Sequence, residues 1–342
     1  MENEITANVQ TEVSSKGNLG GIASRLMDAD FKTNALRTND TLRFVEWQRY
    51  DQALVRETIR PQRAVNALRA AGLTYALGDG LGSMVLMYED VSDLTDANMS
   101  MDAESQRDND RVEFTQKYLP MPIVHKSWFV NGRTLNASRK TGESLDVTQT
   151  AYAGRKIGEY IENMTLNGAN SYNFGNGTIY GMTDHPSKNN IAMAIDWATA
   201  DPLLILDDIL AGVQAVQNDW FYGPYILFVS ANCEAHFGTD YSSHYAKATL
   251  SRIREVNNIQ DVVFCPFLNK TVAASQGVLV QATPDVIRLV EGLPLTNVQW
   301  EEKGNLRFHF KAMQICVPQV RATQAGRMGL CHFKAGLSSA AN

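Results

Sequence analysis

Three polar residues of this sequence carry the side chains of an acid–base site, namely His125, Asp184 and His185. A histidine in contact with a carboxylate can take up and release a proton near neutral pH, which is the chemistry of general acid–base catalysis. His125 is far from the other two in the sequence, so only the fold could bring all three together. An α/β enzyme with a site built from such distant residues therefore stays open as an alternative. For His185 itself, the turn-forming residues of "TDHPSKNN" favour a solvated loop histidine.

Local signatures of phosphate binding, serine hydrolysis and zinc proteolysis are absent, because the sequence contains no P-loop, no GxSxG and no HExxH. Cys233 and His236 have the spacing of two metal ligands, but no second pair lies nearby, so we expect packing and capping roles for them. The glycines at 78, 80 and 82 precede a strand, whereas a dinucleotide loop precedes a helix. We therefore expect no enzymatic activity, no cofactor and no metal site.

The stretch from 89 to 113 is strongly acidic, with nine carboxylates against two arginines, a local charge of −7 in a chain whose net charge is −6. Calcium loops of the EF-hand type need a central glycine, and no glycine occurs in this stretch. Weak surface calcium binding stays open, but the stretch has hardly a side chain suited to a core. We expect it to form a protein contact.

Composition describes an ordinary folded protein of 342 residues, with 44% hydrophobic and 20% charged residues. The pI of about 5.6 argues against a surface that grips nucleic acid through its phosphates. The four cysteines have no CxxC spacing, which favours reduced and mostly buried thiols. The polar start and the absence of a long apolar run predict neither a signal peptide nor a membrane-spanning helix.

The elements around the acidic stretch follow from the pattern of apolar residues. Residues 1–38 read as an extended arm, and two helices follow between 41 and 72. Strands on either side of the acidic stretch predict a long β-hairpin with an acidic tip. The clearest helix is "LDVTQTAYAGRKIGEYIENMTLNG", which Gly168 ends and in which Gly154 and Gly158 allow close packing.

From Asp201 onward helices and strands alternate. The pattern predicts helices over 202–218, from 231 and over 242–256, and strands near 223–230, 261–266, 277–282 and 286–292. The segments "TNVQWEE" and "LRFHFKAMQICVPQV" are again β. The chain is therefore expected to be a mixed α+β protein without internal repeats.

The order of these elements resembles the Hong Kong 97 fold of tailed-bacteriophage major capsid proteins and the related encapsulins. Residues 122–168 are similar to the return strand of the extended loop followed by the spine helix of that fold. "NDWFYGPYILFVSANCEAHF" is similar to the helix-to-strand step of its axial domain. The likeness covers roughly residues 40–335.

This resemblance implies five segments: an N-terminal arm with leading helices (1–83), an extended β-hairpin loop (84–131), a peripheral domain with the spine helix (132–195), an axial domain (196–300) and a C-terminal β segment returning to the peripheral domain (301–342). It implies a major capsid protein that forms the icosahedral head shell around double-stranded DNA, found in the virion and, during assembly, in the host cytoplasm. Its partners would be itself as pentamers and hexamers, a scaffolding protein, a portal protein and possibly a decoration protein, with neither sequence-specific DNA binding nor a membrane.

Charge complementarity suggests how copies would meet. Seven basic residues against two acidic ones give residues 117–156 a charge of +5 directly after the acidic stretch. We expect the acidic tip of one copy to dock on the basic surface of the next, through non-covalent contacts that set register more than strength. The interface residues of this hypothesis are Asp93, Asp96, Asp102, Glu104, Asp108, Asp110, Arg133, Arg139, Lys140, Arg155 and Lys156.

Two alternatives remain beside the phage capsid protein. An encapsulin shell would share the fold and enclose a cargo enzyme in place of DNA. The α/β enzyme named above would be a smaller particle with a polar pocket. An acidic tip that merely aids solubility is the simpler reading of the charged stretch.

Overall fold

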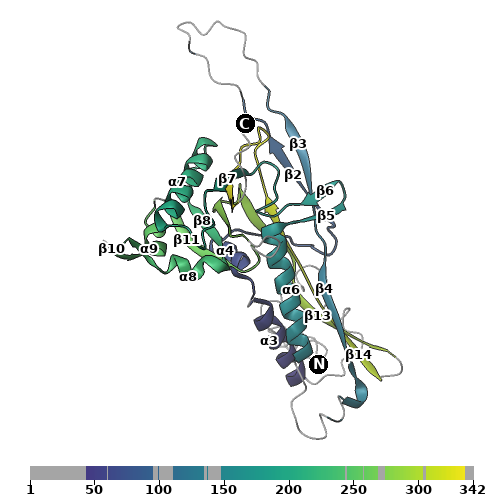
Figure 1. Cartoon of the computed structure of the whole chain (residues 1–342). Helices are drawn as coiled ribbons and strands as arrows, with labels where there is room; N and C mark the ends of the chain where they lie inside the picture. Colours follow the sequence, from purple (N-terminus) through teal and green to yellow (C-terminus); the bar gives the residue numbers. More distant parts are fainter. Residues whose placement is uncertain are drawn as a thin grey trace, which may run out of the picture.

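The computed structural model describes residues 44–59, 61–94, 99, 111–134, 137, 148–242, 245–256, 258–268, 274–302 and 306–335. Two sheets organise this part of the chain, and a β-hairpin projects from the body at one end (Figure 1). Helices and strands are mixed throughout, so the α+β class expected from the sequence is confirmed.

The first sheet has four strands in the order β1 (Thr74–Ala76), β13 (Ile287–Glu302), β14 (Arg307–Val320) and β4 (Val124–Asn131). β1 runs parallel to β13, and the other pairs are antiparallel. Two helices lie along this sheet side by side, α3 (Phe44–Ile59) and α6 (Thr148–Asn167) (Figure 1). β4 is an edge strand of this sheet, and it is the strand that forms the candidate site below.

The second sheet has five strands in the order β11 (Ile259–Cys265), β8 (Tyr225–Ser230), β12 (Gln276–Gln281), β15 (Leu330–Ala335) and β7 (Asn189–Met193). One face packs against α7 (Pro202–Asn218), η2 (Ala231–Cys233), α8 (Glu234–Phe237) and α9 (Thr249–Arg254). Asp201 begins α7 as its N-cap, because its carboxylate accepts the backbone N–H of Leu203 at 3.0 Å.

The other face of the five-stranded sheet packs toward the four-stranded sheet. The core between them includes Phe228 of β8, Ile161 of α6 and Cys316 of β14, all fully or nearly fully buried. The short helix α4 (Arg63–Ala70) lies in this core and contacts α6, β11 and β13. Burial of these apolar side chains is what holds the two sheets together.

Helix α6 ends as its sequence predicts. Gly168 has a φ of +70°, a left-handed conformation that favours glycine, and its N–H donates to Met164 O at 2.9 Å. The close packing expected at Gly154 and Gly158 is also confirmed. A Cβ on Gly154 would lie 2.6 Å from Leu54 O, and one on Gly158 would collide with Thr58 O, so α3 is the helix that packs there.

The projecting hairpin consists of β2 (Val85–Val91) and β3 (Phe114–Pro120), which pair antiparallel from Val85 with Pro120 to Val91 with Phe114. The antiparallel hairpin expected on either side of the acidic stretch is therefore confirmed. A second, small hairpin of β5 (Ala169–Phe174) and β6 (Gly177–Ile179) lies against its root.

One helix expected from the sequence is wrong over half its length. The segment 242–256 was expected to be helical, but β9 (Asp240–Ser242) pairs with β10 (Tyr245–Ala248), and only α9 is helical. Thr249 N donates to Thr239 O at 3.0 Å and closes this hairpin. The first seven residues of this segment have no apolar period of the helical kind, and in the part of them that the structure describes local strand pairing decides the conformation.

Sheet membership also differs from the expected segment boundaries at four strands. β4, grouped with the extended loop, lies in the four-stranded sheet, and β7, grouped with residues 132–195, lies in the five-stranded sheet. β13 begins at Ile287 and lies in the four-stranded sheet, although residues up to 300 were grouped with the alternating region. β15 lies in the five-stranded sheet, although it follows β14 in the chain. Periodicity along a sequence identifies a strand but not the sheet it joins, because pairing partners are distant. Within the described residues, no helix is long and apolar enough to span a bilayer.

Candidate assembly surfaces

The projecting hairpin has two unlike faces. On the inward face, Leu119 is buried, and Leu86 and Tyr88 pack on the core cluster below. On the outward face, three apolar side chains are exposed, Met87 by 59%, Val91 by 50% and Phe114 by 65%. Val91 and Phe114 are directly opposite each other across the two strands. An exposed apolar cross-strand pair of this kind is typical of a surface that another protein covers.

A groove runs around the edge strand β4. It consists of two hollows of about 360 and 450 Å³ that share Pro122, Ile123, His125 and Tyr172. One hollow extends toward α6 and the other toward the root of the hairpin and β14. Ile123, Tyr160 and Tyr172 are each more than two-fifths exposed in it. The groove is therefore an apolar channel beside a strand whose outer edge pairs with no described strand.

The charged residues of the groove are all basic. Lys126 and Lys156 line the hollow beside α6, and Lys311 lines the hollow beside β14. The described residues that line both hollows include no carboxylate. An apolar floor with a cationic rim fits a segment that carries apolar side chains among carboxylates.

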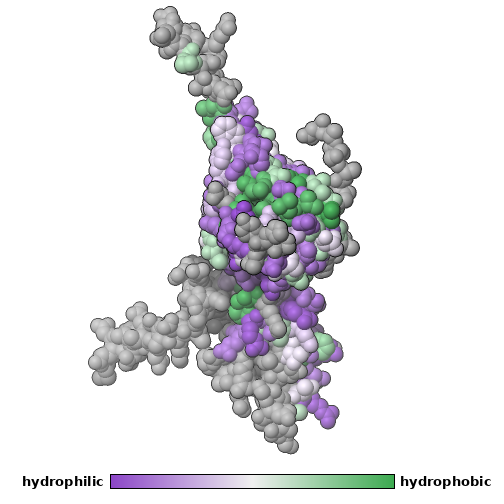
Figure 2. Space-filling view, turned by 60° about the vertical axis from the view of Figure 1, so that its left-hand side comes forward, coloured by the Kyte–Doolittle hydropathy of each residue, from purple (hydrophilic) through white to green (hydrophobic). Residues whose placement is uncertain are grey.

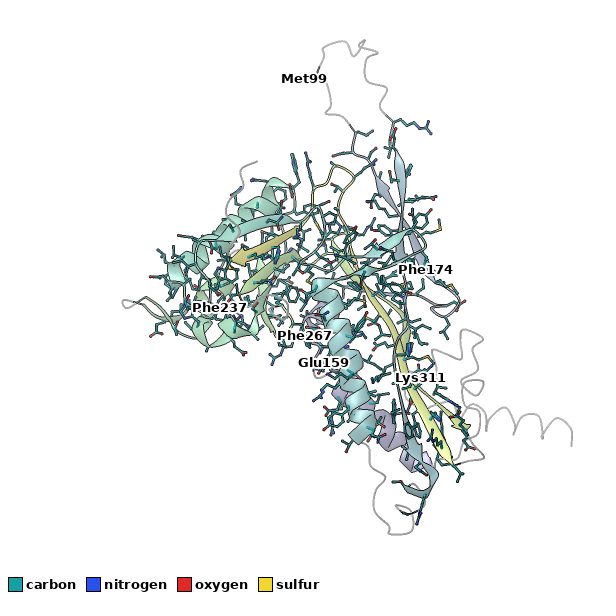
Figure 3. All side chains as sticks on the ribbon, turned by 45° about the vertical axis from the view of Figure 1, so that its right-hand side comes forward. Met99, Glu159, Phe174, Phe237, Phe267 and Lys311 are labelled. Carbon is teal, nitrogen blue, oxygen red and sulfur yellow. The ribbon has the colours of Figure 1, made fainter. Side chains whose placement is uncertain are left out.

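The described strands of the projecting hairpin lead away from the groove. Met84 and Met121, at the root of the hairpin, line the groove. The seven-residue strands then lead about 23 Å away from it. Figure 3 shows Met99 at the far end of the hairpin, away from Lys311 and Glu159 on the body.

The residues of the proposed interface are placed as follows. Lys156 lines the groove, and Arg155 precedes it on α6. Arg133 is exposed beyond the end of β4, roughly 20 Å along the strand from Lys126, so it does not join the groove. Asp93 is exposed just beyond β2. The other residues of the hypothesis, Asp96, Asp102, Glu104, Asp108, Asp110, Arg139 and Lys140, lie outside the described residues.

Two contacts reduce the charge contrast that the sequence indicates. Glu159 lies 2.7 Å from the Lys156 ammonium and 3.4 Å from the Arg155 guanidinium. Lys117 lies 3.3 Å from the buried carboxylate of Asp90, so these opposite charges meet within one hairpin. The basic surface is therefore smaller than the +5 counted from the sequence, and its centre is Lys126, because Glu159 offsets the charge of Lys156.

Sequence reasoning missed the apolar floor of the groove. Tyr160 lies on the solvent side of α6, four residues from Lys156, which is one helical turn away. The pattern that could have indicated the groove was an aromatic residue one helical turn from a lysine. Ile123 and Tyr172 gave no such signal, because they come from other elements.

The three residues of the possible acid–base site do not come together. Asp184 accepts the Gly181 N–H at 2.6 Å, and His185 accepts the Ser187 N–H at 3.2 Å. His125 Nδ1 lies 3.3 Å from Ile123 O, and among the described residues no contact joins His125 to the other two. The expectation of a solvated His185 is wrong: it is only 8% exposed, and this burial lowers its pKa to about 4. It packs edge-on against Tyr180.

The cysteines are free and buried, as expected from their spacing. Cys233 Sγ lies 3.1 Å from Ser275 Oγ, and His236 Nε2 lies 2.6 Å from Ala200 O, so both side chains have packing partners. Burial raises the pKa of Cys233 to about 11. Among the described residues, no three His, Cys, Asp or Glu side chains form a group that could hold a metal ion.

The five-stranded unit carries exposed apolar side chains on its surface. Figure 2 turns this unit toward the viewer and shows an apolar area within a largely hydrophilic surface. Leu203 and Leu210 of α7 and Trp220 are exposed apolar side chains of this unit.

Comparison with known proteins relates the chain to shell-forming particles. Residues 35–333 match the model of a family of unknown function, DUF6260. No curated protein matches the chain. Among solved structures, the virus-like particle from Pyrococcus furiosus is similar with a TM-score of 0.60 and 14% identity, over 85% of this chain and 99% of that chain. The capsid of Myoviridae phage XM1 is similar with a TM-score of 0.61 and 7% identity, over 77% of this chain and 89% of that chain.

A chain from Microbacterium phage Oxtober96 is similar with a TM-score of 0.55 and 12% identity, over 78% of this chain and 90% of that chain. Identities this low show a shared fold. The fold is that of Hong Kong 97 capsid proteins, and the resemblance seen in the sequence is confirmed.

Proposed function

The chain belongs to DUF6260, a family of unknown function, and from its capsid fold we propose that it is a major capsid protein. Copies of it assemble into the icosahedral head shell that encloses the double-stranded DNA of a tailed bacteriophage. The single observation that carries this proposal is the combination of fold and hairpin. A capsid-fold subunit presents an exposed apolar hairpin face, together with an apolar groove with a basic rim beside β4.

The hairpin supplies one half of the contact between copies. Its outward face offers Val91 and Phe114, and Leu94 is exposed by 53% just beyond β2. The acidic stretch that follows carries the charge complementary to the groove rim. We assign to this half of the interface Asp93, Asp96, Asp102, Glu104, Asp108 and Asp110.

The groove around β4 supplies the other half. Its apolar floor receives the apolar side chains, and Lys126 and Lys156 face the carboxylates of the neighbouring hairpin. Arg133, Arg139, Lys140 and Arg155 extend this basic half of the interface. Each exposed ion pair contributes only about 0 to 1 kcal/mol, so the charges select the register while apolar contact contributes most of the affinity. Repetition over a shell multiplies such a weak contact.

In this assignment the four-stranded sheet with α6 is the peripheral domain, and the five-stranded sheet with α7 is the axial domain. Pentamers and hexamers of the chain form the shell, with scaffolding and portal proteins as partners and a decoration protein as a further candidate partner. DNA is enclosed without sequence-specific contacts, which agrees with the net charge of −6. The protein would act in the host cytoplasm during assembly and then in the virion.

A protein nanocompartment of the encapsulin type is the second candidate. The similarity to the Pyrococcus furiosus particle favours it, because the match covers 99% of that chain. Both candidates require a closed shell, and they differ in what the shell contains. Nucleic acid recovered from purified particles would support the phage capsid, and a co-purified protein would support the nanocompartment.

The first experiment is negative-stain microscopy with light scattering on the chain expressed alone and with a candidate scaffolding protein. Closed shells support the proposal, and a particle that stays monomeric or dimeric at high concentration under both conditions contradicts it. The contact itself is tested with the double variant Lys126→Glu and Lys156→Glu, which should remain folded and lose shells. Arg56→Glu is the control, because Arg56 is 77% exposed on α3 and does not line the groove.

Charge reversal on both halves makes the test specific. Adding Asp93→Lys and Asp96→Lys to the groove double variant should restore part of the assembly, because the complementary pair is then inverted. Normal shells from the groove double variant would rule out this docking mode while leaving the capsid fold untouched.

A further inference from the structure

The described contacts between the hairpin and the body extend along β2 as far as Asp90. The inward-facing residues Leu86 and Tyr88 pack on the core, and Asp90, the last inward-facing residue of β2, is buried. Beyond this level the two strands are joined to each other, as by the hydrogen bond from Ser92 N to Glu113 O at 2.9 Å. The direction in which the hairpin leaves the body is therefore decided around Asp90.

Arg321 is the residue of the body that meets the hairpin at this level. Its guanidinium donates to the backbone oxygen of Glu89 at 3.1 Å and lies 3.9 Å from the Asp90 carboxylate. The same guanidinium lies over the ring of Tyr88, 5.4 Å from the ring centroid. One side chain thus contacts three consecutive residues of β2.

The second strand of the hairpin, β3, is contacted by Gln324, three residues after Arg321. Gln324 Nε2 donates to Thr115 Oγ1 of β3 at 3.2 Å. Lys117 of β3 completes the group from within the hairpin, at 3.3 Å from Asp90. Asp90 is only 6% exposed, and a buried carboxylate is stabilised by cations close to it, here Lys117 and Arg321.

The turn that carries Arg321 and Gln324 is also one of the connections between the two sheets, because it joins β14 to β15. Its first residue is tied to the four-stranded sheet, since Arg321 N donates to Val286 O at 2.8 Å. Its other end is tied to the five-stranded unit. Arg327 lies over Trp220, and Met328 N donates to Asp219 at 3.3 Å.

We infer that Arg321 is a positioning residue that couples the direction of the hairpin to the relative orientation of the two sheets. A rotation of one sheet against the other moves the 321–327 turn, and Arg321 carries that movement to β2. On the proposed function, the contact of Arg321 with β2 also sets the curvature of the shell. The angle at which the hairpin leaves the body decides where it meets the neighbouring copy.

The direct test is hydrogen exchange of the unassembled full chain, measured by mass spectrometry on peptides that cover β2, β3 and α6. Arg321→Ala should raise exchange at the hairpin root about tenfold, the effect of losing a hydrogen bond from a charged group, and leave α6 unchanged. Arg327→Ala is the matched control from the same turn, and it should leave the hairpin root at the wild-type rate. Arg321→Lys should lie in between, since it keeps the charge but not the planar donor group.

Particle diameters test the second half of the inference. Arg321→Ala should broaden the distribution of shell diameters in micrographs, and Arg56→Ala, an exposed position on α3 away from this turn, should not. If Arg321→Ala fails to fold, Gln324→Ala removes the contact to β3 alone and should still raise exchange at the root. Unchanged exchange in a folded Arg321→Ala protein overturns the positioning role of Arg321. Unchanged shell diameters despite faster exchange overturn its role in curvature. If the wild-type chain forms no shells, the proposed function fails, while the exchange result still decides whether Arg321 positions the hairpin.

Discussion

The Glu162 carboxylate accepts a hydrogen bond from the backbone N–H of Ala64 at 2.6 Å, which joins helix α6 to the first turn of α4. The N–H groups of Arg63 and Val65 donate to the same carboxylate, each at 3.1 Å. Gln62, at the N-cap position of α4, makes no capping bond with its side chain. Glu162 therefore caps α4 from another helix, and its own side chain is fully buried.

Titration of Glu162 should make subunit stability depend on pH. Burial raises the pKa of Glu162 from 4.5 to about 7, although the three backbone donors lower it. The folded chain then binds the proton more tightly than the unfolded chain, so this group's contribution to the free energy of unfolding falls as pH rises from about 4.5 to 7. The loss is at most about 3 kcal/mol.

Urea unfolding of the unassembled chain at several pH values measures this dependence against Glu162→Gln, which cannot titrate. The difference between the two proteins isolates Glu162 from Asp184, whose pKa is raised to about 6, mainly by burial. A constant difference from pH 4.5 to 7 would contradict the prediction. Glu162→Ala should lose about 2 to 4 kcal/mol at every pH, because it leaves buried N–H groups without an acceptor.

Gly158→Ala should destabilise the subunit despite the better helix propensity of alanine. The new Cβ would collide with Thr58 O, so α3 and α6 must separate, and overpacking of this kind loses about 1 to 3 kcal/mol. Gly78→Ala is the matched control, because nothing lies within 4 Å of its Cβ position. Thermal unfolding of both variants decides the point, and equal effects would contradict the close packing.

A serine substitution should impair assembly on the outward face of the hairpin and stability on the inward face. Phe114→Ser removes an exposed ring and should change the free energy of unfolding by less than about 0.5 kcal/mol, while shell formation drops. Leu119→Ser places a hydroxyl in the core and should lose about 2 to 5 kcal/mol. Chemical unfolding and sedimentation of the same samples separate the effects. Full assembly of the Phe114 variant would show that the outward face needs no partner.

The cysteines should be unreactive while the chain is folded. Burial raises the pKa of Cys316 and Cys331 to about 12 and that of Cys265 well above its usual value, so almost no thiolate is present. A thiol reagent at pH 8 should label none of them, and all four should react in concentrated urea. Asn218→Cys, at an exposed position, is the control that should react at once. Rapid labelling of a native thiol would indicate local opening around it.

Much of the fold was predictable because its signals are local. The stripe of Ile157, Ile161 and Met164 with a final Gly168 indicates α6, and Asp201 followed by a proline begins α7. The hairpin was predictable because strand-forming residues flank a polar insert. These signals need only neighbours within a few positions, which share one helix turn or one strand face.

The site was predictable only in part. The sequence indicates an acidic tip and a basic segment, and Lys156 does lie in the groove. It does not indicate that Lys117 pairs with Asp90 or that Glu159 lies between Arg155 and Lys156. Ion pairing depends on distances of a few ångströms, and a charge count carries no distances.

By itself, the order of residues determined the helices, most of the strands and the distribution of charge between hairpin and spine. Only the tertiary structure decided which sheet each strand joins, which helix Glu162 caps and which residues line the groove around β4. The physical reason is that these contacts join residues far apart in the chain, such as Ala64 and Glu162, 98 positions apart. Their free energy comes from burial and pairing that exist only once the two sheets have packed together.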